Sequence, residues 1–125
     1  MSENELSKTI VDLCFKIHKN LGPGLFESVY EEVLCIELNR SNLKYSRQKP
    51  ISISYEGIPL NIGFIADIIV EDKVIIEIKS VETIKSVHRK QLLTYLKLTN
   101  IKLGLLINFN TSLLKDGVKR IVNNL

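Results

Sequence analysis

The sequence predicts an α/β fold, with a mixed central β-sheet of about four strands flanked by helices. Near the N-terminus, residues 6–21 and 25–40 repeat apolar side chains at the spacing of amphipathic helices. Residues 58–79 instead contain runs of β-branched side chains, which suit the interior of a sheet. A further helical stretch leads to the apolar run 103–107, and a helix between two buried strands is typical of a parallel crossover.

Local signals bound the two N-terminal helices. The first ends in the sequence Leu-Gly-Pro-Gly, in which Gly22 can adopt the positive φ of a helix stop. The second runs from residue 25 to residue 39 or 40 and has Glu27 in its first turn, where the helix dipole favours a carboxylate. Tyr30 follows one turn later, and an aromatic side chain at helical spacing is usually a core residue.

The predicted antiparallel strands occupy the middle of the chain. Alternating polarity, a turn signal at Glu56-Gly57 and apolar runs separate them. In order, we expect a polar connector at 42–50, a half-exposed strand at 51–55, a long strand at 58–70, a polar loop at 71–73 and a strand at 74–79.

The C-terminal third is predicted to contain a helix, a strand and a second helix. Residues 86–98 repeat apolar side chains at helical spacing. The almost continuous apolar run 103–107 is expected to be a central strand that is covered on both faces. A short final helix is predicted at about Asp116 to Asn123, with Val118, Ile121 and Val122 facing inward.

Three charged residues interrupt the apolar hairpin: Asp67, Glu77 and Lys79. A sheet interior does not bury two carboxylates and an ammonium group without a partner, because their desolvation is costly. A divalent cation would be such a partner, and the lysine could then contact a phosphate or a nucleophilic water. A two-residue loop at Glu71-Asp72 would place Asp67 and Glu77 on opposite faces, whereas a three-residue loop or a bulge places them on one face. The metal-site hypothesis therefore requires the second arrangement.

Two motifs resemble a known family. Asp67, followed by nine residues and then Glu77-Ile78-Lys79, is similar to the core signature of the PD-(D/E)XK nuclease superfamily. The sequence GLFESVY, from Gly24 to Tyr30, matches Gly-x-x-Glu-x-x-Tyr, after which the GxxExxY branch of that superfamily is named. The resemblance extends from about Val11 to Asn123 and implies a restriction-endonuclease-like α/β sandwich.

The resemblance also implies roles for individual residues. Mg²⁺ or Mn²⁺ would be bound by Asp67, Glu77, the carbonyl of Ile78 and Glu27, with Glu27 reaching the metal directly or through water. Lys79 would position the attacking water or stabilise the pentacovalent phosphorus. The sequence HRKQLLTYLKL, which begins at His88, matches a family helix whose glutamine, here Gln91, orients the water or the active-site lysine.

DNA or RNA is the implied substrate. The candidate substrate contacts are Tyr30, His88, Arg89, Lys90 and Tyr95, with Lys85 and Lys97 as further phosphate contacts. Each has an ordinary alternative as a core residue or as part of a solvated surface. We therefore keep a second hypothesis, a catalytically inactive module of the same fold that binds nucleic acid or protein, and a third, a structural partner in a toxin or defence complex.

Composition sets the remaining expectations. The chain has 125 residues, a net charge of +3 and 45% hydrophobic residues, which fits one domain spanning 1–125. A mildly basic charge is compatible with nucleic acid but does not indicate it. Cys14 and Cys35 lack the spacing of a zinc site. No secretory signal or membrane-span pattern is visible, so we expect a cytoplasmic protein without membrane association, and we leave open whether it forms a homodimer.

Overall fold

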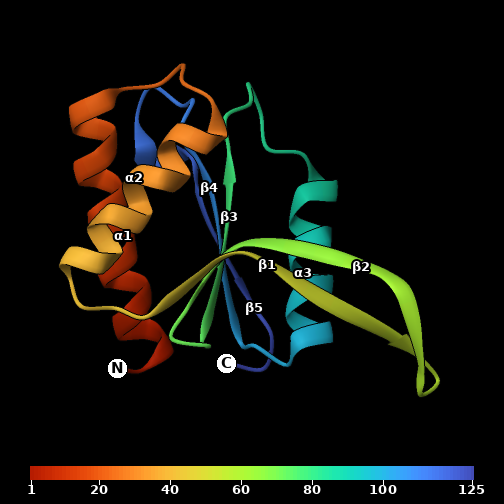
Figure 1. Cartoon of the computed structure of the whole chain (residues 1–125). Coiled ribbons are helices and arrows are strands. Elements are labelled where there is room, and N and C mark those ends of the chain that lie inside the picture. Colours follow the sequence, from red (N-terminus) through yellow and green to blue (C-terminus); the bar gives the residue numbers. More distant parts are fainter.

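The computed structural model covers residues 1–125 and contains a five-stranded mixed sheet with helices on both faces (Figure 1). The helices are α1 (Glu3–Leu21), α2 (Glu27–Arg40) and α3 (Ser86–Thr99), and a short 3₁₀ helix, η1, spans Leu114–Asp116. The strands are β1 (Tyr45–Tyr55), β2 (Ile58–Val70), β3 (Val74–Lys79), β4 (Leu103–Asn108) and β5 (Val118–Val122). The predicted α/β class with a mixed sheet is confirmed.

The strands follow their sequence order across the sheet, β1-β2-β3-β4-β5. Only β3 and β4 are parallel, and α3 connects them. The other neighbours pair antiparallel. The predicted helical crossover is therefore present, and it places the C-terminal ends of β3 and β4 side by side, with Lys79 opposite Asn108.

Each face of the sheet has its own hydrophobic core. Helices α1 and α2 cover one face, where Leu6 and Leu34 pack with Ile76 and Leu105. Helix α3 covers the other face, where Leu92 packs with Ile75. All six residues of β4 are buried, as expected for a strand with helices above and below it. None of the helices combines the length and the apolar character needed to cross a membrane.

Two predicted elements are wrong. The expected final helix at 116–123 is the end of η1 followed by β5, which pairs antiparallel with β4. A strand forms here because β4 would otherwise leave a row of backbone groups without partners. The expected connector at 42–50 is strand from Tyr45 onward, because the long β2 offers it partners as far as Val70.

The hairpin of β1 and β2 forms a long arm that extends beyond the body of the sheet (Figure 1). Its turn has positive φ at both Glu56 (49°) and Gly57 (79°), so the predicted two-residue turn is confirmed. Apolar side chains near this turn stay in solvent, with Tyr55 66% exposed and Ile62 76% exposed.

Tyr30 of α2 fastens the turn between α1 and α2 to the core. Its ring is fully buried and stacks on Phe109, with 4.4 Å between the ring centroids. Its hydroxyl donates to the Gly22 carbonyl (2.6 Å) and accepts from the Leu25 amide (3.2 Å). The core interpretation of Tyr30 is therefore correct. Its proposed role as a substrate contact is wrong, because no part of the side chain reaches the surface.

We predict that Tyr30→Phe lowers the free energy of unfolding by about 1–2 kcal/mol, because the Gly22 carbonyl and the Leu25 amide lose their shared partner. Urea unfolding followed by circular dichroism measures this change. Tyr55→Phe is the matched control and should leave stability unchanged, since Tyr55 is 66% exposed. Equal stability of wild type and Tyr30→Phe would show that the hydroxyl does not hold the turn.

Candidate active site

The loop between β2 and β3 has three residues, Glu71 to Lys73, because Val70 pairs with Val74. The three-residue loop that the metal-site hypothesis requires is therefore confirmed. The pairing continues to Ile68 and Ile76 and stops there. Asp67 and Glu77 come next on the two strands, at the point where the strands separate.

The two acids fill the opening between the strands with reciprocal hydrogen bonds. The Asp67 amide donates to Glu77 Oε2 (3.1 Å), and the Ile78 amide donates to Asp67 Oδ2 (2.9 Å). If the strands had stayed paired, each of these backbone N–H groups would have donated to a carbonyl of the other strand. Here each donates to a carboxyl group instead. This bonding explains how two acids are accommodated in an otherwise apolar hairpin.

The contact between the acids has an electrostatic cost. Burial raises the pKa of Glu77 to about 8, and the negative charge of Asp67 and a hydrogen bond between the two carboxyl groups add to the rise. Glu77 is only 8% exposed, so water screens this repulsion poorly. The positive charge of Lys79 opposes the rise, but it is the smallest of the contributions.

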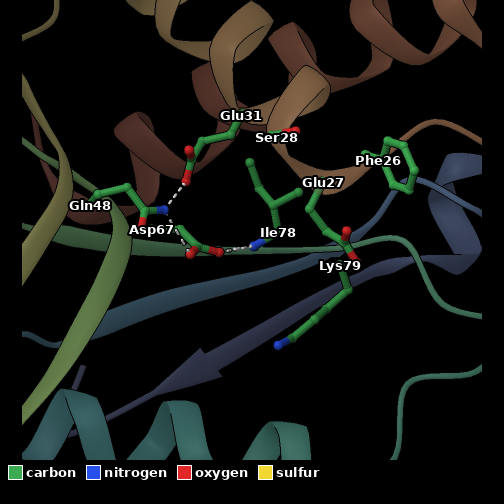
Figure 2. Close-up of a pocket in the computed structure, with 8 residues that line it drawn as sticks. All are labelled: Phe26, Glu27, Ser28, Glu31, Gln48, Asp67, Ile78 and Lys79. Carbon is green, nitrogen blue, oxygen red and sulfur yellow. Dashed lines mark hydrogen bonds between the residues drawn. The ribbon is translucent and has the colours of Figure 1, made fainter.

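Lys79 ends β3 and lies two residues after Glu77, so the two side chains leave the strand on the same side. Figure 2 shows the Lys79 side chain extending away from α2, toward the α3 side of the sheet. None of the four ion pairs in the structure includes Lys79. The site therefore has an ammonium group that no carboxylate neutralises directly.

An open cavity of about 610 Å³ lies over the end of β3, with the first turns of α2 as one wall (Figure 2). It is lined by Phe26, Glu27, Ser28, Glu31, Gln48, Asp67, Ile78 and Lys79. Most of these residues are polar. A polar, open cavity that is lined by Asp67 suits a hydrated, charged ligand better than an apolar one.

Glu27 lies in this cavity but does not join the acidic pair. Its Oε1 accepts from the Ser80 amide (3.3 Å), while the Ser80 hydroxyl donates to the Leu25 carbonyl (2.7 Å). These bonds dock the start of α2 against the end of β3. No three His, Cys, Asp or Glu side chains come close enough together to hold a metal ion. Glu27 was expected to reach the metal directly or through water, and in this arrangement it does not form a three-carboxylate cluster with Asp67 and Glu77.

Helix α3 faces the acidic pair through Tyr95. The Tyr95 ring stacks on Phe64, with 3.7 Å between centroids. Burial raises the pKa of Tyr95, and the charges of Glu77 and Asp67 raise it further, while a hydrogen bond from Gln91 lowers it. Gln91 and Tyr95 are thus near the acids, on the side away from α2.

The other α3 candidates lie further from the cavity. His88 accepts a hydrogen bond from the Lys85 amide at its Nδ1 (3.0 Å) and so caps the start of α3. Arg89 and Lys90 are exposed on the helix surface. None of these three lines the cavity over β3.

Sequence reasoning missed three hydrogen-bonded residues, Glu31, Arg47 and Gln48, of which Gln48 contacts Asp67. Glu31 of α2 is only 6% exposed and accepts from Arg47 Nε (2.8 Å) and from Gln48 Nε2 (2.5 Å). Gln48 also donates to Asp67 Oδ1 (3.3 Å). One signal for Glu31 was available, since it follows Glu27 by one helical turn. Gln48 had none, because it fell within the predicted connector.

The donor set at Asp67 and Glu77 fits a hard divalent cation. Both groups offer carboxylate oxygens, and no cationic side chain pairs with either of them. Mg²⁺ is commonly held by only one or two carboxylates and completes its shell with waters and substrate phosphate oxygens. Two adjacent acids, one of which, Asp67, lines an open polar cavity, meet that requirement.

Comparison with known proteins gave a family match. The sequence model of the PD-(D/E)XK nuclease superfamily matches residues 4–121, which include both acids, Lys79 and all three helices except the first residue of α1. Searches among curated proteins and among solved structures found no match.

We predict that the metal-free protein loses stability as the pH rises from about 5 to 8. In that range native Glu77 keeps a proton that the unfolded chain releases near the ordinary value of 4.5, so a rising pH favours the unfolded state. The decrease should be on the order of 3 kcal/mol and should be nearly absent in Glu77→Gln. Urea unfolding at several pH values, with chelator present, measures it.

Glu37→Gln is the control for this pH series. A hydrogen bond from Lys16 lowers the pKa of Glu37, so this residue titrates below the tested range and its variant should keep the wild-type slope. Parallel curves for wild type and Glu77→Gln would show that Glu77 is not the group responsible.

Proposed function

The chain belongs to the PD-(D/E)XK nuclease superfamily, and we propose that it is a metal-dependent nuclease that hydrolyses phosphodiester bonds in DNA or RNA. The observation that carries this proposal is the contact between half-buried Asp67 and buried Glu77, with an unpaired Lys79 beside it and an open polar cavity lined by Asp67 and Lys79. The motif formed by Gly24, Glu27 and Tyr30 supports placing the chain in the GxxExxY branch.

Asp67 and Glu77 would hold Mg²⁺ or Mn²⁺, with the carbonyl of Ile78 as a further oxygen ligand. Such an ion, when bound, polarises the phosphate and lowers the pKa of a bound water. Glu27 would act through water, because its carboxylate remains bonded to the Ser80 amide. The two acids would therefore bind and orient the ion, and each can keep its hydrogen bond to the backbone while it does so.

Lys79 would act on the phosphate. Its ammonium group is free to donate to a phosphoryl oxygen, where negative charge grows as the water attacks. The strand positions Lys79 through its backbone, because its carbonyl accepts from the Phe109 amide (3.0 Å). Gln91 and Tyr95 close the α3 side of the acids and would orient water there.

The nucleic-acid backbone would extend along α3. Arg89, Lys90 and Lys97 are exposed on this helix, and Lys85 is exposed at its start. Phosphate contacts by such residues supply affinity that does not depend on sequence and that falls steeply as salt increases. His88 lies among them, although its Nδ1 is occupied by the helix cap.

The second candidate function is a catalytically inactive module that binds nucleic acid or protein. The observation that favours it is the position of Glu27, because the acidic pair lacks a third carboxylate close enough to share a metal. In that case Asp67, Glu77 and Lys79 would be inherited from an active ancestor.

We predict that Mg²⁺ or Mn²⁺ in the millimolar range raises the melting temperature by a few degrees, because the ion binds the native site and not the unfolded chain. Asp67→Asn should remove most of this shift, and Glu37→Gln, which lies outside the cavity, should keep it. Differential scanning fluorimetry with and without chelator measures it. The same shift in wild type and Asp67→Asn would place the metal elsewhere.

We also predict that Lys79→Ala lowers the cleavage rate at saturating substrate by at least about 100-fold, because it removes a charge that acts in the transition state. The metal-induced shift in melting temperature should remain. Lys8→Ala, an exposed change on α1, is the control and should cleave normally. The assay uses single- and double-stranded DNA and RNA with Mg²⁺ or Mn²⁺. A folded, metal-binding wild type that cleaves none of them would favour the inactive module.

A further inference from the structure

We infer that Gln48 is a positioning residue, which holds the carboxylate of Asp67 in the orientation that binds the metal and which is itself anchored by Glu31 and Arg47. This inference rests on the proposed function, because it concerns the same metal site. Gln48 comes from β1 and Glu31 from α2, so the support for Asp67 is built from two elements outside the β2–β3 hairpin.

The hydrogen bonds of Gln48 fix the direction of its amide group. Its nitrogen donates to Glu31 Oε1 (2.5 Å) and to Asp67 Oδ1 (3.3 Å), as Figure 2 shows. An ionised carboxylate can only accept, so only the NH₂ side of the amide can serve both partners. Gln48 therefore bridges two acids that would otherwise repel each other.

Asp67 is held at both of its oxygens. Oδ1 accepts from Gln48, and Oδ2 accepts from the Ile78 amide (2.9 Å). A carboxylate that is bonded at one oxygen alone can rotate about its last torsion, and a second donor at the other oxygen restricts that rotation. This restriction matters here because the Asp67 carboxylate lines the open cavity in which a bound ion would lie.

Glu31 makes this support rigid. It is buried, with 6% of its surface exposed, and its second oxygen accepts from Arg47 Nε (2.8 Å). The hydrogen bond to Glu31 raises the pKa of Arg47, which keeps its guanidinium charged. A charged pair between α2 and β1 thus fixes the position of the acceptor to which Gln48 is bonded.

The backbone supports the same conclusion. Gln48 lies within β1 but has φ of 51°, which a residue with a side chain rarely adopts in a strand. The neighbours on both sides pair normally, Arg47 with Ile68 and Lys49 with Ala66, so the distortion is confined to the position opposite Asp67. Strain that is kept at one position next to a candidate site commonly serves that site.

The distortion coincides with a change of face in β2. Before Asp67, the even-numbered Phe64 and Ala66 pack on the α3 side, and after it, Ile68 and Val70 pack on the side of α1 and α2. The strand therefore rotates at Asp67. Gln48 and Asp67 lie opposite each other where β2 rotates. In this arrangement Asp67 contacts Gln48, which is itself bonded to Glu31 of α2.

The test measures Mn²⁺ affinity by isothermal titration calorimetry for wild type, Gln48→Met and Glu37→Gln. Methionine keeps the length of the side chain but donates no hydrogen bond. We expect Gln48→Met to weaken Mn²⁺ binding 10- to 100-fold, as loss of a group that orients a metal ligand commonly does. Glu37→Gln is the control: like Glu31, which anchors Gln48, Glu37 is a buried carboxylate of α2 paired with an arginine, but it lies outside the cavity. It should bind Mn²⁺ like wild type.

A purely structural role predicts a different pattern. If Gln48 only fastened β1 to α2, Gln48→Met would lower the midpoint of urea unfolding and leave the Mn²⁺ affinity unchanged, which would overturn the inference. If Gln48→Met fails to fold, wild type still gives an answer by NMR. The side-chain amide signals of Gln48 should then shift on titration with Mg²⁺, and signals that stay fixed while those of the Ile78 amide move would overturn it.

The same measurements distinguish a failure of the Gln48 role from a failure of the proposed metal site. Wild type that binds Mn²⁺ and cleaves nucleic acid, together with Gln48→Met of equal affinity, would overturn the role of Gln48 alone. Wild type that binds neither Mn²⁺ nor Mg²⁺ would overturn the metal site and the role of Gln48 with it. Weaker binding in Gln48→Met, with normal binding in Glu37→Gln, would support both.

Discussion

The contact between the carboxyl groups of Asp67 and Glu77 is the constraint on which the rest of the site depends. Buried Glu77 lies against half-buried Asp67, and each carboxyl group accepts a hydrogen bond from the backbone of the opposite strand. A folded chain keeps such an arrangement only where other interactions outweigh its repulsion. The buried strands around it supply those interactions, since residues from Val74 to Ile78 are all buried.

The position of the acids follows from how the strands separate. Pairing of β2 with β3 stops at Ile68 and Ile76, and β2 rotates there, so the hairpin opens at its acidic residues. On the other side of β3, pairing with β4 continues to the last residue, Lys79. From Glu77 onward, the edge of β3 that faces β2 is therefore unpaired, while the edge that faces β4 stays hydrogen-bonded. A strand that is rigid on one side and open on the other suits an active site, because it positions side chains without closing over them.

Groups outside the cavity hold this geometry in place. Asn108, only 1% exposed, accepts from the Val81 amide (3.1 Å) and donates to the Val81 carbonyl (2.8 Å), which fixes the chain just after Lys79. The Tyr30 hydroxyl fixes the turn before α2 through its hydrogen bonds to Gly22 and Leu25. The start of α2 and the end of β3 are therefore each attached to the core, and Glu27 and Ser80 connect them to each other.

The sequence by itself determined the elements whose signal is local and the residues whose chemistry conflicts with their surroundings. Helical spacing predicted α1, α2 and α3, and apolar runs predicted β2, β3 and β4. The acids in the hairpin stood out because apolar strands rarely contain them. Loop length then decided their common position, since a three-residue loop sets Asp67 opposite Glu77.

Only the tertiary structure decided the remaining features, because each depends on a neighbour that is distant in sequence. β5 is a strand because β4 offers it an edge, although its residues also suit a short helix. Glu27 bonds to Ser80 rather than joining the acidic pair, because the docking of α2 sets its distance. Gln48 reaches Asp67 because its backbone adopts a positive φ that no pattern in the connector indicated. Local periodicity reports what one segment prefers, whereas these contacts depend on where packing places the other segments.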